Sequence, residues 1–104
     1  MENVFVPTHN RLSNALDFAS GANNILKHSR LFVAWLAAGC GAGALEAAMK
    51  YTSERKQFGK TIDSFQVSQE KISRALALVQ SMITVCIRVS QLYEKDQCSM
   101  SHIA

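Results

Sequence analysis

The sequence is poor in proline, glycine and charge. Its 104 residues contain one Pro and five Gly, which excludes collagen-like and proline-rich disordered chains. Only 18% of the residues are charged and 48% are hydrophobic, a balance typical of a folded chain. The net charge of +3 is too small to indicate a nucleic-acid partner, and we expect none. The length allows at most one ordinary domain, which excludes a complete large enzyme.

The sequence also lacks a metal-binding pattern and a leader sequence. Cys40, Cys86 and Cys98 are widely spaced, with no CxxC pair and no nearby His at metal-ligand spacing. We therefore expect free thiols in a reducing compartment and no metal site. The first ten residues do not resemble a signal peptide, because Glu2 and several polar residues interrupt any apolar region. Any targeting segment is expected outside this chain.

Catalytic groups are scarce as well. His9, His28 and His102 have no Ser or Cys nucleophile pattern beside them, and no two carboxylates are spaced for general acid and base catalysis. We expect each of the three histidines to lie at the surface. The apolar pair Phe32 and Trp35 is expected to belong to the core, although aromatic walls also line cofactor pockets.

What the sequence does contain is helical. A long helix is predicted over residues 25–58, capped by Asn24 and stopped by Gly59. Residues 31–45 carry no charge, but fifteen such positions are too few to span a membrane comfortably. Small residues along this stretch favour close approach of neighbouring helices. We therefore predict a helix inside a bundle, with a membrane-associated helix as the weaker alternative.

A second long helix is predicted after residue 63. Asp63 and Gln66 form a capping-box pattern, and apolar residues then recur every three to five positions until a polar turn at residues 94–97. Ser99 is expected to cap a third helix that the chain barely begins at residues 100–104. At the other end, residues 3–7 predict one short strand ending at Pro7, and residues 8–24 predict a linker.

Two polar clusters are candidate binding sites. Residues 51–60 combine cations with aromatic rings, and the planar fork of Arg55 together with the amides of Gln57 and Gln66 suits a nucleotide diphosphate. The alternative is that these cations contact carbonyl groups at a helix C-terminus and face water. Residues 27–30 form a basic cluster suited to a phosphate-bearing substrate, or simply a solvated helix end. The spacing alone leaves both alternatives open.

The stretch YTSERKQFGKTIDSFQ at residues 51–66 resembles the signature of the acyl-CoA dehydrogenase and acyl-CoA oxidase flavoprotein superfamily. ENVFVP at residues 2–7 is similar to the closing strand of that family's middle β-domain, and residues 29–51 are similar to the first long helix of its C-terminal domain. Within the superfamily, the glutaryl-CoA dehydrogenase and short-chain acyl-CoA oxidase branch is the most similar. The resemblance covers essentially the whole chain.

The resemblance implies an all-α fold. Residues 24–104 would form the first part of the C-terminal helical bundle domain, with two long antiparallel helices of a four-helix bundle. Residues 1–23 would be the end of the middle β-domain, a short strand remnant, and a linker.

The resemblance also implies roles for individual residues. Arg55 matches the Arg that reaches across a subunit interface to the FAD pyrophosphate of a neighbouring chain. Other matching FAD contacts are Lys56, Gln57, Phe58, Phe65 and Gln66. The segment that lies along the acyl-CoA substrate matches Lys27, His28, Ser29 and Arg30, of which Arg30 is the best individual candidate.

The reaction implied for a complete protein is FAD-dependent α,β-dehydrogenation of an acyl-CoA thioester, in a homotetramer. Some branches carry the catalytic Glu immediately before the helix Arg; here that position is Ser29, so we expect no catalytic residue in this chain. The reduced flavin would pass its electrons to an electron-transfer flavoprotein or to oxygen. The implied location is the mitochondrial matrix or the peroxisome, or the cytoplasm of a bacterium. The alternative function is a non-catalytic helical interaction module, a truncated paralogue.

Overall fold

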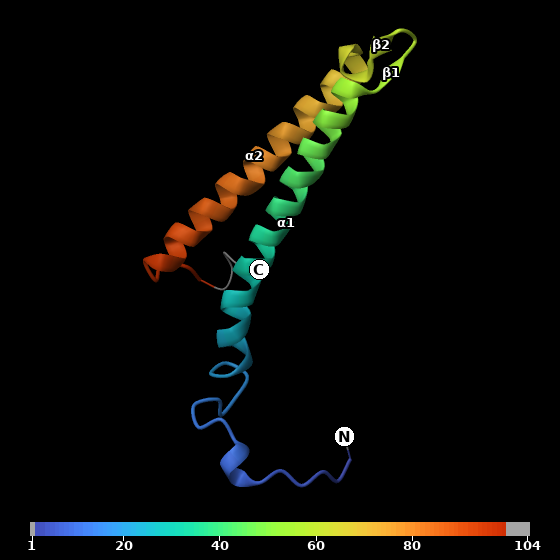
Figure 1. The fold of residues 1–104 in the computed structure, drawn as a ribbon. Helices are drawn as coiled ribbons and strands as arrows, with labels where there is room; N and C mark the ends of the chain where they lie inside the picture. Colours follow the sequence, from blue (N-terminus) through green and yellow to red (C-terminus); the bar gives the residue numbers. More distant parts are fainter. Residues whose placement is uncertain (1, 100–104) are drawn as a thin grey trace.

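The computed structural model describes residues 2–99 and consists mainly of two long helices. Helix α1 spans Ala22–Glu54 and helix α2 spans Gln66–Glu94, and they run antiparallel (Figure 1). Between them, strands β1 (Lys56–Gln57) and β2 (Lys60–Thr61) form a small antiparallel hairpin, followed by the 3₁₀ turn η2 (Ile62–Ser64). A second 3₁₀ turn, η1 (Thr8–Asn10), lies in the N-terminal segment. The predicted all-α helical hairpin is therefore confirmed.

The two helices approach closely near the middle of α1. A Cβ atom added to Gly41 would lie 2.9 Å from Cε of Met82 and 3.6 Å from Cγ2 of Val79, so the missing side chain permits this approach. Further along the pair, Nε1 of Trp35 donates a hydrogen bond to Oγ of Ser90, 3.0 Å away. The helices lie closest next to the β-hairpin and separate toward their other ends (Figure 1).

Few apolar side chains are covered by this arrangement. Within residues 2–99 the buried hydrophobic residues are Ala38, Leu45, Val79, Cys86 and Cys98. Large apolar side chains remain exposed on both helices, among them Phe32, Val33, Leu36, Val67, Leu78 and Val85. Extended apolar surface of this kind marks an interface with other elements. Two helices cannot close a bundle by themselves, so these faces require partners.

The apolar character of the helices bears on the predicted absence of a membrane span. Both α1 and α2 are long and apolar enough to cross a membrane by length and composition, and little of either apolar stretch is buried. Helices at the centre of a bundle have the same length and composition, since their neighbours bury them on every side. The bundle interpretation therefore stays a prediction on this point.

The boundaries of α1 differ from the prediction. Asn24 lies inside the helix, because α1 already begins at Ala22 after Gly21, with no side-chain cap. The helix ends at Glu54 and not at Phe58, because the chain leaves the helix at Arg55 and forms the β-hairpin. Gly59 consequently lies in the hairpin turn with φ of +75° and does not cap the helix. The local sequence is compatible with either a helix end or a hairpin turn here, and the pairing of the two short strands selects the hairpin turn.

The start of α2 also differs in detail. Asp63 lies in η2, and α2 is preceded by Phe65 without a side-chain cap, so the predicted capping box is wrong. The predicted polar turn at residues 94–97 is confirmed, since α2 ends at Glu94 and the amide N–H groups of Asp96 and Gln97 then bond back to its last carbonyl groups. The third helix predicted at residues 100–104 lies outside the described residues.

The predicted strand at residues 3–7 is absent from the structure. A strand is stable only when another strand satisfies its backbone groups, and the described part of the chain offers residues 3–7 no such neighbour. The linker prediction over residues 8–24 holds for residues 8–21, which form η1 and a series of turns. One of these turns is held by Asp17, whose Oδ1 accepts hydrogen bonds from the amide (2.7 Å) and the hydroxyl (2.8 Å) of Ser20.

Candidate functional site

The β-hairpin at the end of the helical pair carries the first candidate site. The amide of Arg55 donates to the carbonyl of Tyr51, 2.9 Å away, and its own carbonyl accepts from the amide of Ile62 at 2.9 Å. These two bonds fix the chain as it leaves α1 and returns toward α2. Pairing of Lys56 with Thr61 and of Gln57 with Lys60 then projects the turn beyond both helices (Figure 1).

Phe58 occupies an unfavourable conformation at the tip of this hairpin. Phe58 and Gly59 have φ of 53° and 75°, the pattern of a two-residue turn in which both central residues are left-handed. A left-handed conformation suits Gly, but for an ordinary L-residue it costs about 1–2 kcal/mol. The ring of Phe58 is 92% exposed, so no packing within the described residues offsets this cost. An outlier of this kind points to a binding role.

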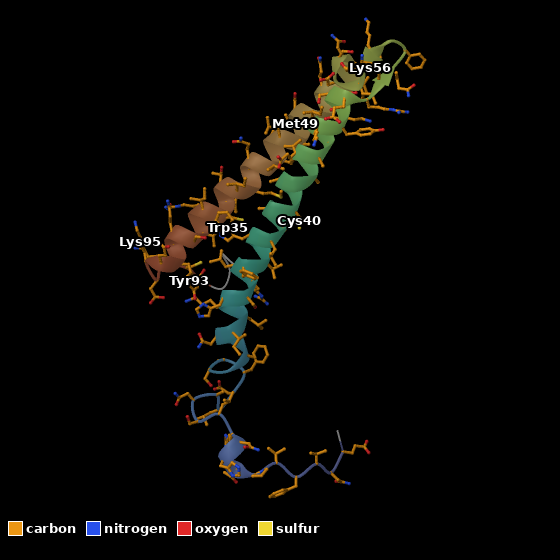
Figure 2. All side chains as sticks on the ribbon, viewed as in Figure 1. Trp35, Cys40, Met49, Lys56, Tyr93 and Lys95 are labelled. Atoms are coloured by element: carbon orange, nitrogen blue, oxygen red, sulfur yellow. The ribbon has the colours of Figure 1, made fainter. Side chains whose placement is uncertain are left out.

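The cations of the β-hairpin lack a counter-ion within the part of the chain that the structure describes. Arg55, Lys56 and Lys60 are exposed, and among residues 2–99 they form no salt bridge, although Glu54 and Asp63 are near in sequence. Figure 2 labels Lys56 at this end of the molecule. Unpaired cations beside an exposed aromatic ring and amide groups are suited to an anion attached to a planar or apolar group.

The structure brings the two predicted FAD-contacting stretches to the same end of the helical pair. Phe65 immediately precedes α2 and is half-buried, and its carbonyl accepts hydrogen bonds from the amides of Ser68 and Gln69. Gln66 is the exposed first residue of α2. The hairpin with Arg55, Lys56, Gln57 and Phe58 lies between α1 and this helix start (Figure 1). All six predicted cofactor-contacting residues therefore belong to one region.

The second predicted cluster lies near the beginning of α1, where it contacts the end of α2. The Nζ atom of Lys27 is 3.6 Å from Oδ1 of Asp96 and 5.2 Å from the centroid of the Tyr93 ring. The hydroxyl of Tyr93 lies 2.6 Å from Nδ1 of His28, and the two rings meet edge to face with centroids 5.3 Å apart. Figure 2 labels Tyr93 at this end of α2.

The other two residues of this cluster differ from Lys27 and His28. The Oγ atom of Ser29 donates to the carbonyl of Leu26, 3.3 Å away, an ordinary bond within a helix. Arg30 is exposed and forms no ion pair in the part of the chain that the structure describes. Arg30 therefore remains available to an external anion, whereas Lys27 and His28 already have partners on α2.

The two candidate clusters are far apart. Arg55 follows Lys27 by 28 positions along α1, and at 1.5 Å per helical residue this corresponds to about 42 Å. The two clusters of one chain are therefore too far apart to form a single compact site.

Tyr93 and Asp96 were missed by the sequence analysis. They are separated from Lys27 and His28 by more than 60 positions, and no local pattern connects them. The sequence contained one signal that could have suggested these contacts. In a helical hairpin with its turn near residue 59, the start of the first helix lies beside the end of the second. The structure also contains an open groove of about 790 Å³ between α1 and α2, lined by apolar side chains such as Leu45, Met49 and Ile72 and by charged ones such as Glu46, Lys50 and Asp63.

The family model described as "Acyl-CoA dehydrogenase, C-terminal domain" matches residues 19–103. The chain belongs to the acyl-CoA dehydrogenase family. This confirms the resemblance that residues 51–66 predicted. The family's C-terminal domain is a helical bundle, in agreement with the helical hairpin described above.

Several acyl-CoA dehydrogenase relatives are similar to the chain over most of its length. Glutaryl-CoA dehydrogenase of Desulfococcus multivorans is 38% identical over 78% of the chain and 21% of its own length. Benzylmalonyl-CoA dehydrogenase of Aromatoleum aromaticum is 34% identical over 88% of the chain and 24% of its own length. Subunit CarC of the caffeyl-CoA reductase-Etf complex of Acetobacterium woodii is 48% identical over 64% of the chain and 17% of its own length. The chain thus spans about a fifth of these relatives.

Proposed function

We propose that this chain is part of an FAD-dependent acyl-CoA dehydrogenase or oxidase that catalyses α,β-dehydrogenation of acyl-CoA thioesters. The observation that carries the proposal is the β-hairpin, where Arg55 and Lys56 form no ion pair among residues 2–99 and Phe58 at the tip is held exposed in a left-handed conformation. Membership of the acyl-CoA dehydrogenase family supports the cofactor assignment.

The residues at the tip fit the chemistry of FAD. A pyrophosphate carries two negative charges, and the guanidinium of Arg55 can grip its oxygens in pairs while Lys56 adds a second positive charge. The amides of Gln57 and Gln66 both donate and accept hydrogen bonds, as ribose and phosphate groups require. Phe58 and Phe65 offer apolar surface beside these polar groups. The exposure of the tip favours contact with FAD held mainly by a neighbouring subunit.

The other cluster is proposed to contact acyl-CoA. Lys27, His28, Ser29 and Arg30 would lie along the substrate, with Arg30 as the principal anion contact, since it is exposed and unpaired within residues 2–99. Because about 42 Å separates this cluster from Arg55, each chain would serve the substrate in one active site and the cofactor in another. A homotetramer satisfies this requirement, and it would also cover the apolar faces of both helices.

Proton removal is proposed to occur outside this chain. Ser29 occupies the position of the catalytic Glu in some branches, and its hydroxyl is too weakly basic to remove an α-proton and is already bonded to Leu26. When bound, FAD supplies the acceptor for the hydride that leaves the β-carbon. The role of this chain is therefore to bind and orient. The CarC relative, named for a complex with Etf, supports an electron-transfer flavoprotein as the partner that takes up the electrons.

The product of the whole gene provides the test. We expect it to purify with bound flavin, and its visible flavin absorbance should bleach when an acyl-CoA is added without oxygen. Glutaryl-CoA and a short straight-chain acyl-CoA are the first thioesters to try, since the branch resemblance predicts them. A colourless product of about the mass of this chain, 11.5 kDa, would overturn the proposal. The proposed location, the mitochondrial matrix, a peroxisome or a bacterial cytoplasm, is tested separately by fractionation.

A second candidate function is a non-catalytic helical interaction module. The observation that favours it is the amount of apolar surface that α1 and α2 leave exposed. Such a module would purify without flavin but in a complex with a complete family member when the two are co-expressed. In that complex, Arg55→Ala would leave the flavin content unchanged. If Arg55 instead contacts FAD, the same substitution should lower the flavin content.

A further inference from the structure

The contacts between the two helix ends centre on one side chain that the sequence analysis did not single out. Tyr93, in the last turn of α2, touches both members of the proposed acyl-CoA cluster that face α2. Its ring lies under the ammonium group of Lys27, and its hydroxyl lies against the imidazole of His28. No other described residue contacts both of these side chains by an ion pair, a hydrogen bond or a ring interaction.

Tyr93 holds the imidazole ring of His28. The hydroxyl of Tyr93 lies 2.6 Å from Nδ1 and 3.1 Å from Nε2 of His28, and the two rings meet edge to face with centroids 5.3 Å apart. These contacts restrict rotation of the imidazole, so His28 is oriented before a ligand arrives.

Tyr93 also fixes the ammonium group of Lys27. Lysine side chains have long flexible stems, and holding one over an aromatic face removes much of that freedom before a ligand arrives. Asp96 is 95% exposed, and its 3.6 Å ion pair with Lys27 therefore contributes little in water. A phosphate group can displace Asp96 from the ammonium group without disturbing the contact with the ring. Asp96 thus acts as a weak competitor for the same charge.

We propose that Tyr93 is a positioning residue for acyl-CoA: it presents Lys27 and His28, already oriented, to phosphate oxygens of the coenzyme A moiety. This inference rests on the proposed function, which places residues 27–30 along the substrate. It adds that the end of α2 contributes to substrate affinity, although α2 itself supplies no substrate contact. The side chains that meet at this end of the helical pair are Lys27 and His28 on α1, Tyr93 on α2 and Asp96 just after α2.

The test measures affinity and turnover in the complete flavoprotein. Tyr93→Leu should weaken binding of coenzyme A about two- to fivefold, the range expected for loss of an exposed cation–π contact, and raise the KM for the acyl-CoA with kcat unchanged. Tyr93→Phe keeps the ring and should weaken binding less. Asp96→Asn should strengthen binding, because it removes the competing charge. The control is Glu70→Gln, which removes an unrelated ion pair with Arg74 on α2 and should change nothing.

The outcomes separate the positioning role from the proposed function. An unchanged coenzyme A affinity in Tyr93→Leu, or a fall in kcat with KM unchanged, would overturn the positioning role while leaving the proposed function intact. A wild-type protein that neither binds coenzyme A nor oxidises an acyl-CoA would overturn the proposed function itself.

Discussion

The indole Nε1 of Trp35 donates a hydrogen bond to Oγ of Ser90 on the opposite helix, and the two atoms are 3.0 Å apart. This is a direct polar link between α1 and α2. Trp35 is the only Trp in the sequence, so its fluorescence reports the contact without interference. The pair therefore offers a way to measure how firmly the two helices are held together.

Ser90→Ala should lower the free energy of unfolding by about 0.5–1.5 kcal/mol, the usual net contribution of a hydrogen bond. The loss should fall in the lower part of this range, because Trp35 is 39% exposed and water can take the place of Ser90. Denaturant unfolding followed by Trp fluorescence measures the change. Ser81→Ala is the matched control, since the Ser81 hydroxyl bonds only to the Ala77 carbonyl within α2. An equal effect of both substitutions would contradict a link between the helices through Trp35.

The glycines of α1 should respond differently to substitution by Ala. At Gly43 an added Cβ meets nothing within 4 Å, so Gly43→Ala should stabilise helix α1 by about 0.5–1 kcal/mol through better helix propensity. At Gly41 the same gain in helix propensity is opposed by a close contact, because an added Cβ would lie only 2.9 Å from Cε of Met82. The net effect of Gly41→Ala on stability should therefore be close to zero. Gly41→Leu should be destabilising by about 1–3 kcal/mol.

Thermal unfolding of these glycine variants checks the account of the helix crossing. Gly41→Leu combined with Met82→Ala should recover part of the lost stability, because the shorter side chain at position 82 makes room for the new one. Equal responses at Gly41 and Gly43 would mean that the close approach of the helices is wrong. In a full assembly, destabilisation by Gly43→Ala would reveal a neighbouring helix on that face.

Phe58→Asn should make the hairpin more stable and the proposed cofactor site worse. Asn tolerates the left-handed conformation that Phe58 adopts, so the free energy of unfolding should rise by about 1 kcal/mol. Phe58→Ala removes the ring but keeps the unfavourable conformation, and it should not bring this gain. Both variants should retain less flavin in the complete protein. If Phe58→Asn were stabilised and bound flavin normally, the exposed ring would have no part in binding.

The N-terminal turn should depend on pH. Hydrogen bonds from Ser20 hold the pKa of Asp17 below its ordinary value of 3.8. A carboxyl with a lowered pKa in the folded state stabilises that state above its ordinary pKa, and the contribution is lost as the pH falls through the lowered value. The turn should therefore loosen below about pH 3.8. An NMR titration of the Asp17 carboxyl should show the low pKa. Ser20→Ala should raise this pKa only part of the way toward the ordinary value, because the hydroxyl is lost while the amide of residue 20 still donates to the carboxyl. No difference between the two proteins would contradict the hydrogen bond from the Ser20 hydroxyl.

The sequence predicted the main elements of the fold because their signals are local. The apolar periodicity of α2 and the uncharged stretch of α1 indicate two long helices whatever surrounds them. The end of α1 was placed too late, because Gly59 is equally suited to a helix terminus and to a hairpin turn. The strand at residues 3–7 failed for the opposite reason, since a strand needs a paired neighbour and the described part of the chain offers it none.

The same difference between local and long-range signals decides which parts of the candidate site could be predicted. Residues 55–66 are close in sequence, and one turn followed by a helix start is enough to bring them together. The contacts of Lys27 and His28 with Tyr93 and Asp96 depend on the register of the two helices, which no local pattern encodes. The distance of about 42 Å between the clusters likewise follows only once α1 is known to be continuous between them.

The central claim is that Arg55, at the start of the β-hairpin, binds the pyrophosphate of FAD. Its most direct test is the FAD affinity of the complete protein carrying Arg55→Ala, with Arg88→Ala as the matched control because Arg88 is an exposed Arg on α2, away from the tip. Loss of charge-assisted hydrogen bonds should weaken FAD binding about ten- to a hundredfold in Arg55→Ala, while Arg88→Ala should bind FAD as the wild type does. Equal FAD affinity in all three proteins would contradict the account.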